Sequence, residues 1–193
     1  MGSKPATTRE AILGRAYECA REQGLAALGI RGLARECGVA TGTIYNYFPD
    51  MASLRTEVVQ RFWESAIEGA ALEPRLREGD TALDYCRRLY DGLSSSLAGF
   101  RASWLKEVSG IDGRTRERTR RAMRECLETV CGMIRQAIED DTAISAEARS
   151  RLDPDALARL IWSAMYSSMR DATDSCDVLL EALELALYRR GVV

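Results

Sequence analysis

A short polar run near the N-terminus carries side chains that can contact a nucleic acid. The run is Thr41-Gly42-Thr43-Ile44-Tyr45-Asn46-Tyr47. Hydroxyl groups can hydrogen-bond base edges or phosphates, and a glycine lets a backbone approach a ligand closely. These residue types, in this order, favour a recognition surface whose first residues read the ligand.

The composition removes the commonest catalytic chemistry. The 193 residues include no histidine, which excludes Ser-His-Asp and Cys-His catalysis and removes the commonest zinc-ligand nitrogen. An enzyme that uses lysine or carboxylates remains open, although Lys4 and Lys106 are the only lysines. We therefore expect a protein that is not an enzyme, and we assign no catalytic residue, metal site or cofactor.

Six cysteines are spread along the chain, and none forms a Cys-x-x-Cys pair. They are Cys19, Cys37, Cys86, Cys126, Cys131 and Cys176. In a reducing compartment, free cysteines usually behave as small buried apolar residues. We expect that behaviour here, and a redox or metal role is the alternative.

The elements that must position these residues are all predicted to be helices, because no segment alternates apolar and polar strand formers. One helix is expected to open at Thr7 or Thr8, where Thr7 and Glu10 have the spacing of a capping box, and to stop at Gly24. The others are expected at about 30–37, 41–47, 51–70, 81–100, 102–109, 114–140, 154–173 and 176–190. Asp50 is expected to cap the helix that begins at residue 51, and Asp153-Pro154 is a strong start signal.

Two of these predicted helices form a recognisable pair. The helices at 30–37 and 41–47 are joined by a turn that contains Gly38, and the second is short and polar. This is the pattern of a helix-turn-helix unit, whose second helix lies in the major groove of DNA. Val39, Ile44 and Phe48 are the apolar residues expected to anchor that helix to the rest of the domain.

The distribution of charge agrees with a nucleic-acid partner at the N-terminus. The first 48 residues carry a net charge of +2 and the remainder −4. The N-terminus has no apolar segment typical of a secretory signal, and no apolar run approaches the roughly 20 residues that span a membrane. We expect a cytoplasmic protein with no membrane partner.

Over residues 8–55 the sequence resembles the TetR (tetracycline-repressor-like) family of transcriptional regulators. The matching residues are Ile12-Leu13-x-x-Ala16, Gly24, Leu33-Ala34, Gly38-Val39, Gly42-Thr43-Ile44-Tyr45, Phe48 and Leu54. The resemblance implies an all-α protein of about nine helices. It would have a three-helix helix-turn-helix DNA-binding domain at 1–50 and a ligand-binding and dimerisation domain at 51–193, joined through the fourth helix.

The resemblance also implies roles for single residues. Residues expected to contact double-stranded DNA are Arg31, Thr41, Gly42, Thr43, Tyr45, Asn46 and Tyr47. Among them, Thr41, Thr43 and Asn46 would face bases, and Tyr45 and Tyr47 would contact phosphates or thymine methyl groups.

Two positions depart from the family pattern. Ala40 stands where the family usually has a serine or threonine cap, so Thr41 or solvent must satisfy the first helical amides. Met51 stands where the family often has a lysine that contacts a phosphate. Loss of that contact is expected to lower DNA affinity and its salt dependence.

The last two predicted helices are apolar over more than one face, which a small domain cannot bury alone. In the first, Leu157, Leu160 and Ile161 lie on one face and Trp162 and Met165 on another. A homodimer through these helices is expected, and a deep monomeric core is the alternative. A two-fold dimer would bind a near-palindromic operator.

The resemblance further implies a pocket for a small, mostly apolar effector. The residues expected to line it are Tyr90, Leu93, Trp104, Leu127, Trp162 and Tyr166. A basic run from Arg114 to Arg124 is expected to be a solvated face, with an acidic ligand or a second nucleic-acid contact as the alternative.

Taken together, these patterns predict a DNA-binding transcriptional regulator, and we expect a repressor that a small apolar ligand releases from its operator. The alternative is a helical small-molecule-binding protein or enzyme of the same fold without a DNA function. Polyanion binding and its salt dependence would distinguish the two.

Overall fold

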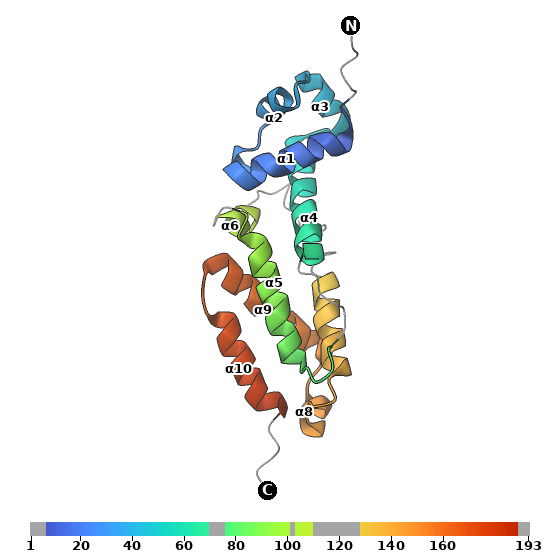
Figure 1. Cartoon of the computed structure of the whole chain (residues 1–193), viewed down its shortest axis with the longest axis vertical. Coiled ribbons are helices and arrows are strands. Elements are labelled where there is room, and N and C mark those ends of the chain that lie inside the picture. The colour runs from blue at the N-terminus through green and yellow to red at the C-terminus, as the bar shows by residue number, and fades with distance from the viewer. Residues whose placement is uncertain (1–6, 70–75, 101–102, 110–127, 189–193) are drawn as a thin grey trace. The chain divides into compact units, whose positions relative to one another are not determined.

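The computed structural model describes residues 7–69, 76–100, 103–109 and 128–188 (Figure 1). Its elements are α1 (Arg9–Gln23), η1 (Leu25–Ala27), α2 (Ile30–Cys37), α3 (Thr41–Tyr47), α4 (Met51–Gly69), α5 (Ala82–Leu97), α6 (Trp104–Ser109), α8 (Ala146–Arg151), α9 (Pro154–Asp171) and α10 (Ser175–Tyr188). Residues 128–140 are also helical, and no strand occurs in the described ranges. The all-α prediction is confirmed. Leu127 and the basic run at 114–124 lie outside the described residues.

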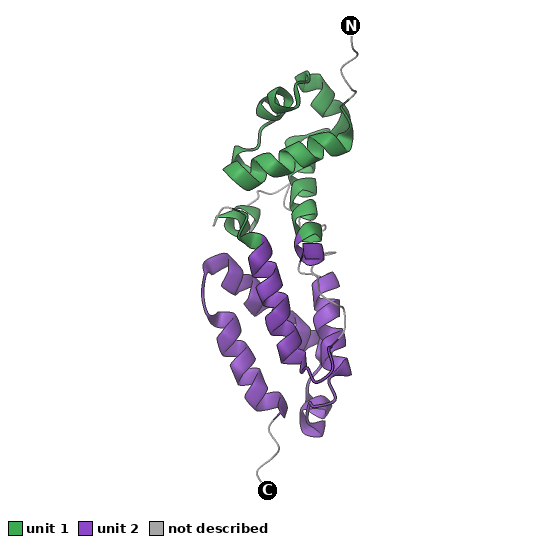
Figure 2. Cartoon of the chain, viewed as in Figure 1, with its two compact units in different colours: residues 1–65, 97–124 green, residues 66–96, 125–193 purple. Residues whose placement is uncertain are grey.

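By their contacts, the residues group into two compact units (Figure 2). Unit 1 comprises residues 1–65 and 97–124, and unit 2 comprises residues 66–96 and 125–193. Unit 1 therefore contains α1, α2 and α3, but also most of α4 and the short helix α6. It is larger than the segment 1–50 that the sequence predicts as the DNA-binding domain.

Helix α1 begins at a different threonine from the one in the predicted capping box. Thr8 is the N-cap, and its Oγ1 accepts a hydrogen bond from the Ala11 amide at 3.1 Å. Thr8 is one of the two threonines predicted to open the helix, but the predicted capping box between Thr7 and Glu10 was wrong, because Glu10 pairs with Arg61 of α4. A threonine at either position can serve as a cap, so spacing alone does not choose between them.

Gly24 ends α1, as predicted. Its amide donates to the Ala20 carbonyl at 2.9 Å, and its φ of +93° is a conformation that L side chains rarely adopt. A Cβ at this position would also lie 2.9 Å from Oε2 of Glu107 in α6. The backbone conformation therefore requires glycine, and any side chain here would also displace the end of the Glu107 side chain.

Aromatic rings fill the part of unit 1 where α4 meets Phe100 and α6. The Phe62 ring centroid lies 4.8 Å from that of Phe100 and 5.3 Å from that of Trp104. Tyr17 of α1 packs edge-on against Phe100 at 5.6 Å. Phe62 and Trp104 are each about 1% exposed, so this cluster is a core of unit 1.

Unit 2 has its own core, built mainly from aliphatic side chains. Its buried members include Leu89 and Leu93 of α5, Val130 and Ile134 of the helix at 128–140, Ile161 and Met165 of α9, and Leu180, Leu183 and Leu187 of α10. Helices α9 and α10 pack along each other. Asp153 caps α9 with Pro154 at its first turn, as the sequence predicts.

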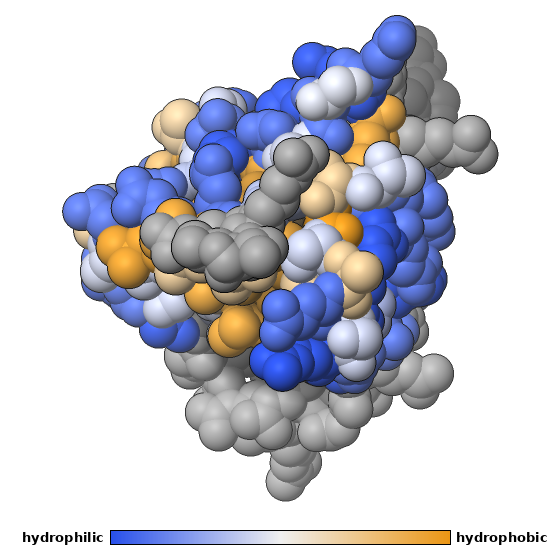
Figure 3. Space-filling model, turned by 90° about the horizontal axis from the view of Figure 1, so that it is seen from below, coloured by the Kyte–Doolittle hydropathy of each residue, from blue (hydrophilic) through white to orange (hydrophobic). Residues whose placement is uncertain are grey.

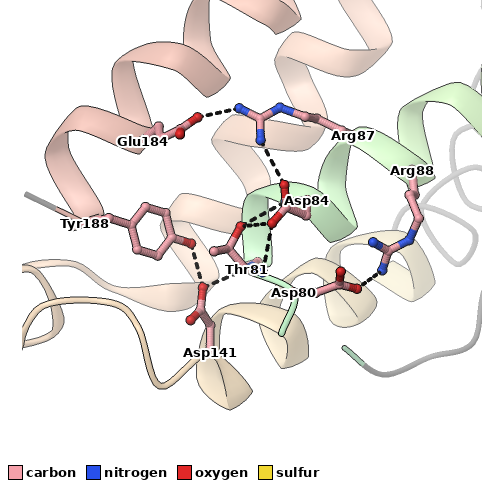
Figure 4. Close-up of polar contacts among 9 residues, drawn as sticks. Asp80, Thr81, Asp84, Arg87, Arg88, Asp141, Glu184 and Tyr188 are labelled. Carbon is pink, nitrogen blue, oxygen red and sulfur yellow. Dashed lines mark hydrogen bonds and ion pairs between the residues drawn. The ribbon is translucent and has the colours of Figure 1, made fainter. Parts of the chain in front are cut away.

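A polar network ties the ends of unit 2 together (Figure 4). Asp141 is 2% exposed, and its carboxylate accepts hydrogen bonds from the Ala82 amide at 2.7 Å and from the Tyr188 hydroxyl at 2.5 Å. Burial and this hydrogen bond raise the pKa of Tyr188. Arg87 joins Asp84 of α5 to Glu184 of α10, at 3.2 and 2.6 Å. The network fixes the start of α5 against the end of α10.

Two short elements were missing from the predicted series. One is η1, and the other is α8, which Ser145 caps by accepting a hydrogen bond from the Ala148 amide at 3.2 Å. Both are shorter than two turns, so neither displays the apolar period from which helices are predicted. No helix in the described part of the chain is both long and apolar enough to cross a membrane.

Candidate DNA interface

Helices α2 and α3 form the helix-turn-helix through a tight glycine turn (Figure 1). Gly38 ends α2 in the left-handed conformation, with φ 64° and ψ 33°. The Val39 amide then donates to the Ala34 carbonyl at 3.0 Å, which closes the turn. Ile30, Leu33 and Ala34 bury one side of α2.

Helix α3 has a buried side and an exposed side. Ile44 and the following Phe48 are both 0% exposed, and they attach the helix to unit 1. The side that faces away is polar or aromatic, with Tyr45 51% and Tyr47 37% exposed. A helix held by two apolar anchors and otherwise open to solvent can enter a groove without losing its packing.

The predicted contact residues lie on α2 and α3 and differ in their exposure. Thr41, Gly42, Asn46 and Arg31 are exposed, and Thr43 is half-buried. Arg31 stands at the second position of α2 and makes no ion pair within the described ranges. Its guanidinium is available to a phosphate.

The two tyrosines, which the sequence treats alike, differ in the structure. The Tyr47 hydroxyl donates to the Thr7 carbonyl at 3.0 Å, just before α1. The Tyr45 hydroxyl has no hydrogen-bond partner among the described residues. Tyr47 therefore helps to position α3, whereas Tyr45 projects from it.

The structure places both residues that depart from the family pattern, Ala40 and Met51, at the start of a helix. Ala40 is the N-cap of α3 and supplies no side-chain hydrogen bond. Met51, at the start of α4, is half-buried. Asp50 caps α4 as predicted, since its Oδ1 accepts from the Ser53 amide at 2.6 Å.

Ion pairs join α1 to α4 within unit 1. Sequence spacing gives no means of finding them. Arg9 pairs with Glu57 at 2.5 Å, and Arg61 pairs with Glu10. The Arg9 guanidinium also lies 4.9 Å from the centroid of the Phe48 ring. The partners are about 50 residues apart in sequence, and no local pattern connects them.

Two charged side chains hold η1, the short element between α1 and α2. Glu107 of α6 accepts a hydrogen bond from the Ala26 amide at 3.2 Å. Arg55 of α4 donates to the Leu28 carbonyl at 3.2 Å and to the Ala26 carbonyl at 3.4 Å. Both α4 and α6 are therefore bonded to the segment that precedes the helix-turn-helix.

The predicted effector-lining residues are divided between the two units. Trp104 lies in the aromatic cluster of unit 1. Tyr90, Leu93, Trp162 and Tyr166 lie in unit 2, where Leu93 and Trp162 are buried and the two tyrosines are half-buried. The rings of Trp162 and Tyr166 are 6.1 Å apart, as expected for their spacing on one face of α9.

Unit 2 contains a pocket of about 160 Å³ that is lined by residues other than the predicted effector-lining ones. Its lining is Ile138, Glu139, Ile144, Ala148, Arg149, Leu152, Pro154, Leu157 and Leu187. None of these belongs to the predicted effector set. Apolar side chains predominate, so the pocket suits a small apolar molecule.

The fold and this interface define a class: an all-α protein with an N-terminal helix-turn-helix. Residues 12–58 match the family model described as bacterial regulatory proteins, tetR family. The N-terminal domain is therefore similar to that of the tetR family of bacterial regulatory proteins. No curated protein sequence matches the chain.

Solved structures share the fold over nearly the whole chain. A putative TetR-family transcriptional regulator from Vibrio parahaemolyticus is 22% identical, with 94% of this chain and 99% of that chain covered and a TM-score of 0.59. FadR from Bacillus subtilis, in complex with stearoyl-CoA, is 20% identical, with 93% and 98% covered and a TM-score of 0.62. BioQ with its double-stranded DNA operator is 18% identical, with 94% and 98% covered and a TM-score of 0.62. The described part of the chain thus has the fold of TetR-family transcriptional regulators.

Proposed function

We propose that this chain is a transcriptional repressor that binds double-stranded operator DNA through α3 and is released by a small, mostly apolar ligand. The observation that carries the proposal is the exposed side of α3. Its polar and aromatic residues face solvent, while Ile44 and Phe48 anchor the opposite side. Such a helix can lie in the major groove and read bases with Thr41 and Thr43.

The similar structures support this proposal at the level of the fold. BioQ was solved with its double-stranded DNA operator, and FadR with stearoyl-CoA. Both share the arrangement of helices with this chain. DNA binding and ligand binding are therefore compatible with one chain of this size and fold.

The surface of α10 supports a homodimer. Leu180, Leu183 and Leu187 bury one side of this helix in unit 2. Val178 and Leu185, seven positions apart, share the other side and are 64% and 56% exposed. Two opposite apolar sides on one helix exceed what a single chain covers.

Helix α9 offers a matching surface beside α10. Leu160 is 52% exposed, and the exposed Ala156 and Ser163 near it are small. Small side chains let two helices approach closely. Seen from below, hydrophobic residues lie at several places on the molecular surface among hydrophilic ones (Figure 3). We propose a two-fold dimer through α9 and α10, which would bind a near-palindromic operator with half-sites about 34–36 Å apart or a multiple of that distance.

The proposed effector binds in unit 2, among Tyr90, Leu93, Trp162 and Tyr166. A buried leucine and tryptophan beside two half-buried tyrosines favour an apolar molecule with few polar groups. To release DNA, the ligand must prefer a conformation that no longer matches the groove spacing. The coupling free energy between effector binding and DNA binding is usually about 1–3 kcal/mol in such switches. The effector weakens DNA binding by the same factor by which DNA weakens effector binding.

The experiment that tests the proposal is the selection of bound sites from random double-stranded DNA by the full-length protein. The expected result is one enriched, near-palindromic sequence whose affinity falls steeply with salt. Apolar compounds that raise the melting temperature are then titrated against the complex and are expected to release the DNA. Failure to enrich any sequence would contradict DNA binding and would favour a small-molecule-binding protein of the same fold.

A further inference from the structure

The arginines of helix α1 are all paired with carboxylates, whereas those of α2 are not. The pairs of α1 are Arg9–Glu57, Arg15–Glu36 and Arg21–Glu18. Helix α3 contains no arginine, and Arg31 and Arg35 of α2 make no ion pair within the described ranges. The positive charge that ion pairs leave unneutralised in these three helices therefore lies on α2.

Arg31 and Arg35 share one exposed face of α2. They are four residues apart, so they are neighbours on the helix surface, with Cβ atoms about 5–6 Å apart. Both are exposed, while apolar residues bury another side of the helix. The only carboxylate of α2, that of Glu36, is paired with Arg15 of α1 at 2.6 Å. The two guanidinium groups are therefore open to an anion from outside the chain.

Gly32 lies between the two arginines in sequence and is also exposed. A glycine inside a helix is less favourable than an alanine. Nothing lies within 4 Å of the position that a Cβ would take at Gly32, and its φ is not positive. Neither packing nor backbone conformation thus requires glycine here, and what glycine provides is a bare backbone that a ligand can approach closely.

All three residues are unfavourable for the stability of α2 itself. Like charges four residues apart repel each other, and Arg31 adds a cation to the first turn, where the helix dipole disfavours it. Gly32 adds its entropic cost. Local choices that oppose the fold are expected at functional sites. A bound anion would relieve the repulsion between the arginines, and Gly32 would let that anion come near.

We propose that Arg31, Gly32 and Arg35 form a phosphate-binding surface for the DNA backbone, with Arg35 as a second phosphate contact beside Arg31. This inference rests on the proposed DNA-binding function and extends it from α3 to α2. In a helix-turn-helix unit, the helix before the recognition helix crosses the DNA backbone. Guanidinium groups bond phosphate oxygens in a bidentate manner, and such contacts fix the orientation of the protein without reading sequence. Arg35 is thus a positioning residue for α3.

The test uses the full-length protein and a random-sequence DNA duplex as the probe, because phosphate contacts do not depend on sequence. The affinities of wild type, Arg35→Gln, Arg35→Lys and Gly32→Ala are measured at several salt concentrations. Arg151→Gln removes an equal charge from unit 2 and is the control for Arg35→Gln. Gly132→Ala is the control for Gly32→Ala, because Gly132 is also a helical glycine with nothing within 4 Å of its Cβ position. Circular dichroism checks that each variant is folded.

Arg35→Gln should weaken binding and reduce the slope of log affinity against log salt by about 1. Arg35→Lys keeps the charge and should keep the slope, and Arg151→Gln should bind like wild type. A wild-type slope for Arg35→Gln would overturn the proposal.

Gly32→Ala should bind the duplex several-fold more weakly although its melting temperature rises, because alanine stabilises the interior of a helix. Gly132→Ala should also raise the melting temperature but leave the affinity unchanged. Wild-type affinity of Gly32→Ala would overturn the role of the bare backbone. Failure to enrich an operator would contradict sequence-specific reading by α3, yet the salt slopes on the random duplex would still decide the role of Arg35. Absence of any salt-dependent binding by wild type would overturn both.

Discussion

The hydroxyl of Tyr47 donates a hydrogen bond to the carbonyl oxygen of Thr7, 3.0 Å away. This bond connects the last residue of α3 to the segment that begins α1. Tyr47→Phe removes it and should lower the free energy of unfolding by about 0.5–1.5 kcal/mol. Urea unfolding measures the change. Tyr45→Phe is the control, and an equal effect of both substitutions would show that the bond does not stabilise unit 1.

Arg31 is expected to contact a DNA phosphate, since it is exposed and makes no ion pair within the described ranges. Arg31→Ala should weaken DNA binding and reduce the slope of log affinity against log salt by about 1. The measurement is a titration with the selected operator at several salt concentrations. Arg151→Ala, in unit 2, is the control and should leave the slope unchanged. An unaltered slope for Arg31→Ala would exclude this contact.

The exposed side of α10 should be the centre of the dimer. Leu185→Glu places a charge where an apolar contact is proposed, and burial of an unpaired charge is costly. The variant should be monomeric at micromolar concentration, as light scattering would show. Leu152→Glu replaces another exposed leucine, which lies outside α10, and should remain dimeric. A Leu185→Glu variant that stays dimeric would remove α10 from the interface.

Cys86 should make stability fall in alkaline solution. Burial raises the pKa of its thiol from 9.0 to about 12. The thiol of the unfolded chain has a pKa of 9.0, so the stabilising effect of the buried thiol is complete below pH 9. This effect is lost as the pH rises toward 12, because over that range the thiol loses its proton only in the unfolded chain. The difference in the free energy of unfolding between wild type and Cys86→Ala should therefore shrink by about 1 kcal/mol between pH 8 and pH 10.

A control substitution at a buried residue without a titratable group distinguishes titration of the Cys86 thiol from a general effect of pH on a truncated core. Leu89→Ala also opens space in the core of unit 2. Its difference from wild type should be the same at pH 8 and pH 10. A constant difference for Cys86→Ala as well would mean that the thiol titrates normally.

Local features of the fold could be predicted from sequence because each depends on only a few adjacent residues. Gly24 ends α1, Gly38 turns the chain between α2 and α3, and Asp50 and Asp153 cap the helices that follow them. The apolar anchors of α3 could also be predicted, because Ile44 and Phe48 lie one turn apart.

Relationships between distant segments could not be predicted in this way. The pair Arg9–Glu57 depends on how α1 lies against α4, which no local pattern encodes. The same applies to Trp104, expected in an effector pocket, whose ring packs on Phe62 in unit 1. Tyr45 and Tyr47 look equivalent in sequence, but Tyr45 is more exposed and only Tyr47 bonds to the Thr7 carbonyl.

The central claim is that α3 reads DNA, and the affinity of Tyr45→Ala for the selected operator tests it most directly. Tyr45 is 51% exposed, so its truncation should leave the fold intact, as circular dichroism would verify. We predict a loss of about 1–3 kcal/mol in binding free energy, the scale of one good contact. Leu152→Ala, an exposed truncation in unit 2, should bind like wild type. A folded Tyr45→Ala variant that binds the operator as tightly as wild type would contradict the account.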